Sequence, residues 1–124
     1  MLDIKTEVLK AESRIRTHIR ETPLDFSVPL SQLTHANLYL KCESLQYTGS
    51  FKVRGALNAL LSLSKKQQNG IVAASTGNHG AAVAYGLHQL NLPGVIFVPE
   101  NVSFVKKENI SFYTDPLQLY GKDC

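Results

Sequence analysis

The sequence contains few of the residues that mark several common classes of protein. Its 124 residues include no tryptophan, one methionine and two cysteines. Two cysteines, Cys42 and Cys124, cannot build a disulfide framework or a four-cysteine zinc site. A reducing cytoplasm is therefore the expected location. No apolar run approaches the roughly 20 residues needed to span a bilayer, and the first residues lack the pattern of a secretory signal.

Charge of one sign is also scarce. Thirteen lysines and arginines stand against ten acidic residues, a net charge of +3. The basic residues are scattered, so pairs such as Lys65-Lys66 are interpreted as solvated helix faces and no nucleic-acid partner is expected. His79 has no second ligand at metal-binding spacing, so no metal site is expected. The 44% of hydrophobic residues predicts one folded globular domain.

Hydrophobic periodicity predicts alternating helices and strands. Asp3 can cap a first helix with Val8, Ile15 and Ile19 on one face, which Thr22-Pro23 should stop. Residues 24–36 are interpreted as an irregular connection. Strands are expected at 37–41, 71–74, 95–98 and from 117, and helices at about 50–64, 81–90 and 103–113. This alternation predicts an α/β fold of three layers, with a mostly parallel sheet and helices on both faces.

Two polar loops, 43–50 and 75–80, each follow a predicted strand and precede a predicted helix. We expect them at the same edge of the sheet, where such folds bind ligands. After the first loop, Lys52 stands in the first turn of a helix, whose field disfavours an ammonium group. A neutral lysine can form a Schiff base with a carbonyl compound. The alternative is that Lys52 and Arg54 are ordinary surface charges.

The second loop is Ser75-Thr76-Gly77-Asn78-His79-Gly80. Gly77 permits a close backbone approach, and the N–H groups that begin the next helix form an anion site. Thr76 and Asn78 add side-chain donors, so a carboxylate or phosphate would suit the loop. The alternative is an ordinary helix cap provided by Ser75 or Thr76.

Together the two loops resemble a known family. The run from Lys41 to Ala56, which contains Ser50-Phe51-Lys52, and the later Ser75–Gly80 loop are similar to the pyridoxal-phosphate-dependent threonine/serine dehydratases. Their fold is the tryptophan-synthase-β-like fold, fold type II. The resemblance covers nearly the whole chain from about residue 10. It implies the cofactor pyridoxal 5'-phosphate and the lyase reaction that converts L-threonine or L-serine to a 2-oxo acid and ammonia. It also implies a homo-oligomer, a dimer, in the full-length family.

The resemblance also implies a role for individual residues. Lys52 would hold the cofactor covalently and move protons at the substrate α-carbon. Phe51 would pack beside the cofactor ring, and Asn78 would hydrogen-bond the 3-hydroxyl of the ring. The substrate carboxylate would be held by the second loop, namely Ser75, Thr76, Gly77, Asn78 and His79.

Two positions bear on the subfamily. Val53 stands where related synthases have an aspartate, which favours the dehydratases. Thr76 stands where a serine racemase uses a smaller hydroxyl residue as acid and base, which disfavours racemisation.

Family members usually continue well beyond this length, and nothing in residues 81–124 resembles their glycine-rich loop for the cofactor phosphate. The sequence is therefore expected to be an N-terminal portion. Residues 1–36 would pack on an absent larger domain, and residues 37–124 would form the small α/β domain that carries both loops.

Three hypotheses remain for the function. The first is the dehydratase, represented here by its N-terminal portion. The second is a non-catalytic truncated homologue that acts as an association partner. The third is a small anion-binding α/β module, which leaves the Ser50-Phe51-Lys52 motif unexplained.

Overall fold

The computed structural model describes residues 3–113 and 117–122; Cys124 lies outside them. The predicted α/β class with a parallel sheet is confirmed. The elements, in chain order, are α1 (Ile4–Ile15), the 3-10 turn η1 (Arg16–His18), β1 (Leu24–Phe26), α2 (Val28–Thr34), β2 (Tyr39–Lys41), η2 (Glu43–Leu45), α3 (Lys52–Ser62), η3 (Gln67–Asn69), β3 (Ile71–Ala74), α4 (Asn78–Leu90), β4 (Gly94–Val98), α5 (Phe104–Ser111) and β5 (Leu117–Leu119).

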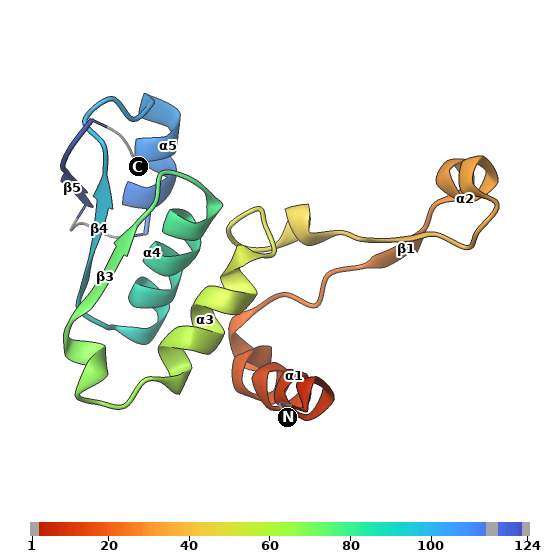
Figure 1. The fold of residues 1–124 in the computed structure, drawn as a ribbon, viewed down its shortest axis with the longest axis horizontal. Coiled ribbons are helices and arrows are strands. Elements are labelled where there is room, and N and C mark those ends of the chain that lie inside the picture. Colours follow the sequence, from red (N-terminus) through yellow and green to blue (C-terminus); the bar gives the residue numbers. More distant parts are fainter. Residues whose placement is uncertain (1–2, 114–116, 123–124) are drawn as a thin grey trace.

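The body of the molecule is a parallel sheet of order β3-β4-β5 with helices packed against it. Ala73 and Leu117 flank Ile96 on the central strand, and Ile96 is fully buried beneath the helices. Helix α4 contacts β3, β4, α3 and α5 (Figure 1). On β3, Val72 is 65% exposed. Within the described ranges, the expected cover of helices on both faces is therefore met on one face only.

Helix α1 packs on α3 through its C-terminal end. Its start is as predicted, because the Asp3 side chain accepts a hydrogen bond from the backbone N–H of Thr6. Ile15 and Ile19 are buried in the core, but Val8 is 59% exposed. The apolar face predicted for this helix is thus covered only at one end.

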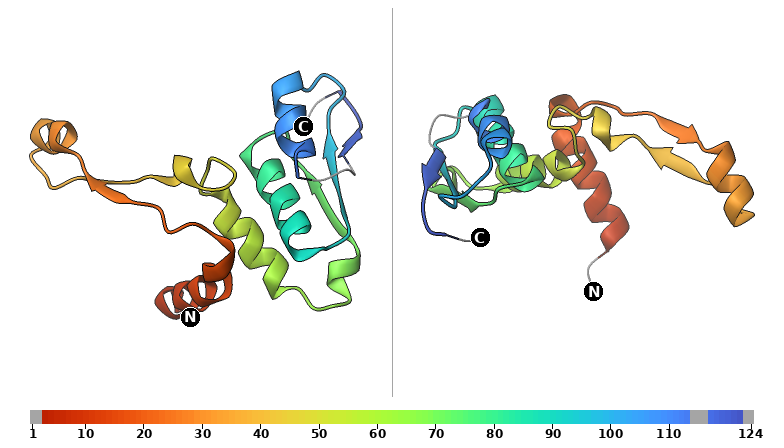
Figure 2. Two further views of the ribbon diagram at one scale, coloured as in Figure 1. Left: turned by 180° about the vertical axis from the view of Figure 1, so that it is seen from behind. Right: turned by 90° about the horizontal axis from the view of Figure 1, so that it is seen from above.

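Residues 24–36 are not the irregular connection predicted from the sequence. They contain β1, which pairs antiparallel with β2, and α2, which begins with Pro29 in its first turn. We call β1, α2 and β2 the arm. It extends away from the body, as both views in Figure 2 show. Strand β2 pairs with β1 across Phe26 and Tyr39, whose ring centroids are 5.3 Å apart, and does not join the parallel sheet.

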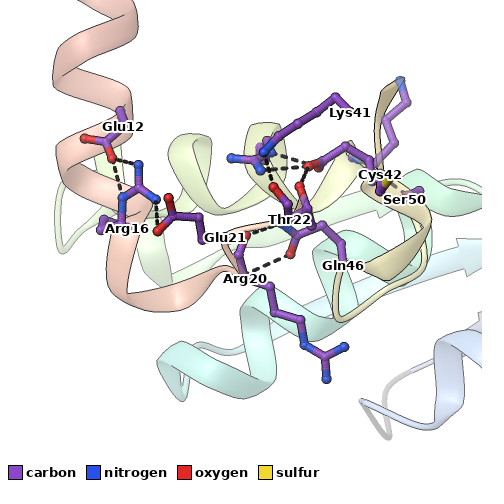
Figure 3. A network of polar contacts seen from close by, with 12 residues as sticks. Glu12, Arg16, Arg20, Glu21, Thr22, Lys41, Cys42, Gln46 and Ser50 are labelled. Carbon is purple, nitrogen blue, oxygen red and sulfur yellow. Dashed lines mark hydrogen bonds and ion pairs between the residues drawn. The ribbon is translucent and has the colours of Figure 1, made fainter. Parts of the chain in front are cut away.

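A polar network joins the root of the arm to α3 (Figure 3). The carboxylate of Glu43 accepts hydrogen bonds from Arg54 Nε at 2.8 Å, Arg54 Nη2 at 2.7 Å and Thr22 Oγ1 at 2.6 Å. Lys41 Nζ donates to the carbonyl of Thr22 at 2.6 Å. The hydrogen bonds from Arg54 are the main reason why the pKa of Glu43 falls to about 2. Arg54 is therefore not the ordinary surface charge that the sequence allowed.

Helix α3 packs against α4 at Gly86, where the absence of a side chain leaves room for Leu60. A Cβ at Gly86 would lie 2.5 Å from Cδ1 of Leu60 on α3. Val53, Leu57 and Leu60 fill the α3 side of this contact and are all buried. The small residues of α4 allow α3 to pack directly against it. This packing sets the distance between the loops that precede the two helices.

We predict that Gly86→Val destabilises the fold by about 1–3 kcal/mol, because the added methyl groups overpack the contact with Leu60. Thermal or urea unfolding followed by circular dichroism measures the change. Gly55→Val is the matched control on α3, where a Cβ would meet no atom within 4 Å. Its stability should be unchanged or slightly raised, since valine favours a helix more than glycine does. Equal effects of both substitutions would contradict this account of the contact.

We also predict a stability loss in acid that depends on Glu43. Its pKa is lowered on folding from 4.5 to about 2, so its stabilising contribution is complete above about pH 4.5 and is lost as the pH falls towards 2. The contribution is on the order of 3 kcal/mol. Urea unfolding at pH 3 and pH 6 measures this effect. At pH 6, Glu43→Gln should be less stable than the unmodified chain, and its free energy of unfolding should change less between the two pH values.

The control for this prediction is Glu7→Gln, which removes an exposed ion pair with Lys10. Exposed pairs contribute little, so its stability should stay within about 0.5 kcal/mol of the unmodified chain. An unchanged acid dependence in Glu43→Gln would show that the network does not link pH to folding.

Candidate functional site

Lys52 is the first residue of α3, and its side chain is exposed. Its Nζ lies 5.3 Å from the ring centroid of Phe51, which is itself 60% exposed. The next residue, Val53, is fully buried and anchors this turn in the core. The structure therefore presents an amine and an aromatic ring side by side at the surface, on a helix whose first turn is fixed.

The second loop folds back against the start of α4. Ser75 extends β3 by donating its N–H to the carbonyl of Phe97 at 3.2 Å. Its Oγ accepts the N–H of Gly77 at 3.3 Å, and α4 begins at Asn78. A Cβ at Gly80 would lie 2.4 Å from the carbonyl oxygen of Ser75. Only glycine permits this close approach, which holds the loop over the N-terminus of α4.

The two loops meet in one pocket of about 400 Å³. Thr48 and Gly49 line it from the first loop, and Thr76, Gly77 and Asn78 line it from the second. Lys52, Phe51, Ser75 and His79 are not among its lining residues. The structure thus brings together part of the predicted site and leaves the lysine and the ring outside the lining of this pocket.

The loops do not meet for the reason expected from the sequence. Strand β2 belongs to the arm, so the first loop does not follow a strand of the parallel sheet. The expectation that both loops share one sheet edge is wrong on this point. The packing of α3 on α4 brings them together instead, because each loop leads directly into one of these helices.

Several residues of the pocket carry no signal in the sequence. Lys106, Asn109 and Tyr113 reach it from α5 and the residue beyond its cap. Their proximity depends on the turn after β4, which periodicity does not predict. Thr48 was also missed, although its Oγ1 is buried without a hydrogen-bond partner in the described part of the chain. A buried hydroxyl without a partner is costly, so a polar ligand group in the pocket would stabilise it.

Stacked tyrosines form one wall of the site. The rings of Tyr47 and Tyr85 stack with centroids 5.3 Å apart, and Tyr113 meets Tyr85 edge-on at 5.4 Å. The hydroxyl of Tyr113 donates to the carbonyl of Tyr47 at 3.0 Å. Burial raises the pKa of Tyr85 to about 12, so its hydroxyl stays protonated at neutral pH. This wall ties α4 and α5 to the loop before Lys52.

These residues suit the cofactor that the resemblance implies. Lys52 offers a primary amine for attachment, the exposed face of Phe51 can pack on a planar ring, and Asn78 offers an amide. The buried Oγ1 of Thr48 supplies an unused polar contact in the adjoining pocket. In residues 3–113 and 117–122, no group of three potential ligands could hold a metal ion. None of the described helices is long and apolar enough to cross a bilayer.

Comparison with curated proteins gives close relatives. The chain is 44% identical over 110 residues to an L-threonine dehydratase of Staphylococcus epidermidis, which covers 88% of the chain and 26% of the relative. It is 43% identical over 111 residues to human serine racemase, which covers 86% of the chain and 33% of the relative. The chain therefore spans about a quarter to a third of these relatives.

Solved structures agree with this similarity. Maize serine racemase superposes with a TM-score of 0.88 at 32% identity, over 95% of this chain and 36% of that one. Threonine deaminase of Solanum lycopersicum superposes with a TM-score of 0.79 at 31% identity, over 94% of this chain and 34% of that one. The predicted tryptophan-synthase-β-like fold is thereby confirmed, and the superposition includes most of the chain.

The sequence profile of one family, described as pyridoxal-phosphate dependent enzyme, matches residues 15–123. The match includes both loops, the arm and the parallel sheet. The chain belongs to the pyridoxal-phosphate-dependent enzyme family.

Proposed function

We propose that the chain carries the lysine and substrate-carboxylate parts of a dehydratase for hydroxy amino acids, which converts L-threonine or L-serine to a 2-oxo acid and ammonia. One observation carries this proposal. The loop before Lys52 and the loop at the start of α4 line the same pocket, although more than twenty residues separate them in the sequence. We take this pocket as the anion site and Lys52, which follows Gly49 in the chain, as the reactive amine that acts beside it.

Each residue of the site has a chemical task in this proposal. Thr76 and the N–H groups at the start of α4 bind the substrate carboxylate, since a helix N-terminus favours an anion. Lys52 would hold the cofactor through its Nζ, and the same amine, once released from the cofactor, would take the proton of the substrate α-carbon. Phe51 and Asn78 hold the ring. Pyridoxal phosphate, when bound, supplies the electron sink that makes this proton removable.

The pocket also restricts where the substrate lies. Tyr47, Tyr113 and Asn109 are among the residues that line it, so an amino acid bound there by its carboxylate would have its side chain directed by these groups. A well-defined orientation is what proton removal at one carbon requires. Ser75 stabilises the loop, because its Oγ accepts a hydrogen bond from the N–H of Gly77. His79 is exposed in the first turn of α4, and its contact with a carboxylate stays part of the proposal.

The choice of dehydratase over racemase rests on Thr76. Both activities occur in the names of similar proteins, so similarity alone does not decide. Threonine keeps the hydroxyl that binds a carboxylate but adds a methyl group, which crowds the approach of that hydroxyl to the α-carbon. Elimination needs one proton-transfer group, Lys52, whereas racemisation needs a second on the opposite face.

Location and assembly belong to the same proposal. A cytoplasmic dimer is consistent with the mild charge and the two cysteines of the sequence. The exposed apolar residues of the arm, such as Leu24, Leu33 and Tyr39, are the surface through which further protein would be contacted. In the alternative, a non-catalytic truncated homologue that acts as an association partner, the chain would use the same surface but would not turn over threonine or serine.

We predict that Lys52 reacts with pyridoxal phosphate. After mixing and borohydride reduction, mass spectrometry of a tryptic digest should find the pyridoxyl group on Lys52 in preference to every other lysine. Lys52→Arg keeps the positive charge but cannot be attached, so it should lose at least nine-tenths of the labelling. The matched control is Lys65→Arg, an exposed lysine after α3, which should label as the unmodified chain does.

Labelling spread evenly over the lysines would contradict the proposed role of Lys52. Specific labelling without any 2-oxo acid from threonine or serine would favour the non-catalytic homologue over the dehydratase. The 2-oxo acid is measured by its reduction with a coupled dehydrogenase.

A further inference from the structure

The buried polar side chains gather around one loop. Thr22, Gln46 and Ser50 are the buried polar residues among those the structure describes, and they are 5%, 3% and 7% exposed. Gln46 and Ser50 belong to the loop that precedes Lys52, and Thr22 lies beside it in the segment 20–22. Buried polar groups need specific partners, so directional contacts hold this loop in addition to the stacking of Tyr47 on Tyr85.

Gln46 makes the most complete of these contacts. Its Oε1 accepts the backbone N–H of Arg20 at 3.2 Å, and its Nε2 donates to the backbone carbonyl of Arg20 at 2.7 Å. One side-chain amide thus satisfies both backbone groups of a residue 26 positions away, as a neighbouring β-strand would (Figure 3). Only a side chain with a donor and an acceptor can do this.

Other contacts of the segment 20–22 reinforce the same loop. Arg20 Nη1 donates to the carbonyl of Leu45 at 3.1 Å, and its guanidinium lies 4.5 Å from the ring centroid of Tyr47. Thr22 Oγ1 donates to Glu43, which also holds Arg54 on the first turn of α3. The loop is therefore fixed from the segment on one side and from α3 on the other.

The first turn of α3 depends on this loop. Phe51 is the N-cap residue, and its side chain makes no capping hydrogen bond. The N–H of Lys52 instead approaches Ser50 Oγ at 3.4 Å, and Ser50 is buried. Gly49, with φ of 68°, links Ser50 to the part of the loop that Gln46 anchors. A shift of the loop would therefore change the start of α3, where Lys52 lies.

We propose that Gln46 is a positioning residue for Lys52. Its side-chain amide docks the loop of residues 43–50, which we call the lysine loop, on the backbone of Arg20. The task of Lys52 in this proposal rests on the proposed function. The claim that Gln46 holds the loop before Lys52 does not. It differs from a simple stabilising role because it assigns the effect to the loop and the first turn of α3, and not to the core that α3 and α4 share.

Hydrogen exchange tests the structural part on the 124-residue chain without cofactor. Gln46→Glu keeps the shape but replaces the donor to the Arg20 carbonyl with a carboxylate oxygen. Amide exchange measured by mass spectrometry should become at least tenfold faster in peptides covering residues 43–52 and stay unchanged in α4. Gln32→Glu, on an exposed position of α2, is the matched control and should change neither. Unchanged exchange in residues 43–52, or an equal rise throughout the chain, would overturn the proposal.

The rate of pyridoxal-phosphate labelling at Lys52 tests the positioning itself. Gln46→Glu should lower this rate at least tenfold while the final extent of labelling stays the same. A faster-exchanging loop with an unchanged labelling rate would overturn the proposal, since α3 alone would then position Lys52. If the unmodified chain shows no preference for Lys52, the proposed function fails, and the exchange experiment still decides whether Gln46 holds the loop.

A second pair of variants covers the case in which Gln46→Glu does not fold. Arg20→Pro removes the N–H that Gln46 accepts, and Ile19 already has the extended backbone that precedes proline readily. Arg20→Ala keeps that N–H but loses the guanidinium contacts. Arg20→Pro should slow labelling of Lys52 more than Arg20→Ala does. Equal slowing by the two variants would assign the positioning to the guanidinium, which both lack, and would overturn the role of Gln46.

Discussion

Helices α3 and α4 can approach closely because Gly86 leaves room for Leu60, and the site exists because of this approach. Each helix begins at a chemically distinct loop, one with Lys52 and one with Thr76 and Asn78. When the two helices pack, the loop before α3 and the loop and first residue of α4 are carried to the same pocket. The parallel sheet contributes indirectly, since β3 and β4 hold α4 in place. The geometry of the site is therefore set by helix packing, with the sheet as its support.

The arm places a different demand on the fold. Its apolar residues, including Phe26 and Leu33, are exposed, so apolar burial within the described residues does not hold it. What holds it is polar: Glu43, Arg54, Thr22 and Lys41 join its root to α3. Since β2 leads directly into the lysine loop, the same hydrogen bonds that fix the arm also fix the loop. The network that attaches the arm to α3 is thus also the network that holds the loop before Lys52.

Sequence patterns predicted much of the body and little of the arm. Continuous apolar runs indicated β3 and β4, and the stripe of Val53, Leu57 and Leu60 indicated α3, because burial on one face produces a detectable period. Strand β1 has three residues, all exposed, so no period marks it. Thr76, Gly77 and Asn78 were named from the sequence and line the pocket, whereas Thr48 and the route of the first loop to the pocket were not, since β2 does not join the parallel sheet. Gln46 had no detectable signal, because its role depends on a backbone 26 residues away.

Apolar packing places the helices in this fold and hydrogen bonds place the loop before Lys52, and their different physics explains why. Apolar packing is strong and nearly non-directional, so it suits the placing of whole helices, as in the contact of Leu57 and Leu60 with α4. A hydrogen bond contributes less net free energy but weakens steeply when misaligned, so it suits the setting of a loop to within a fraction of an ångström. Gln46 and Ser50 of this loop are buried whereas Lys52 is exposed, which is the arrangement that keeps a reactive group accessible on a fixed backbone. The loss of an apolar contact should therefore lower the free energy of unfolding, whereas the loss of the Gln46 amide should first displace Lys52.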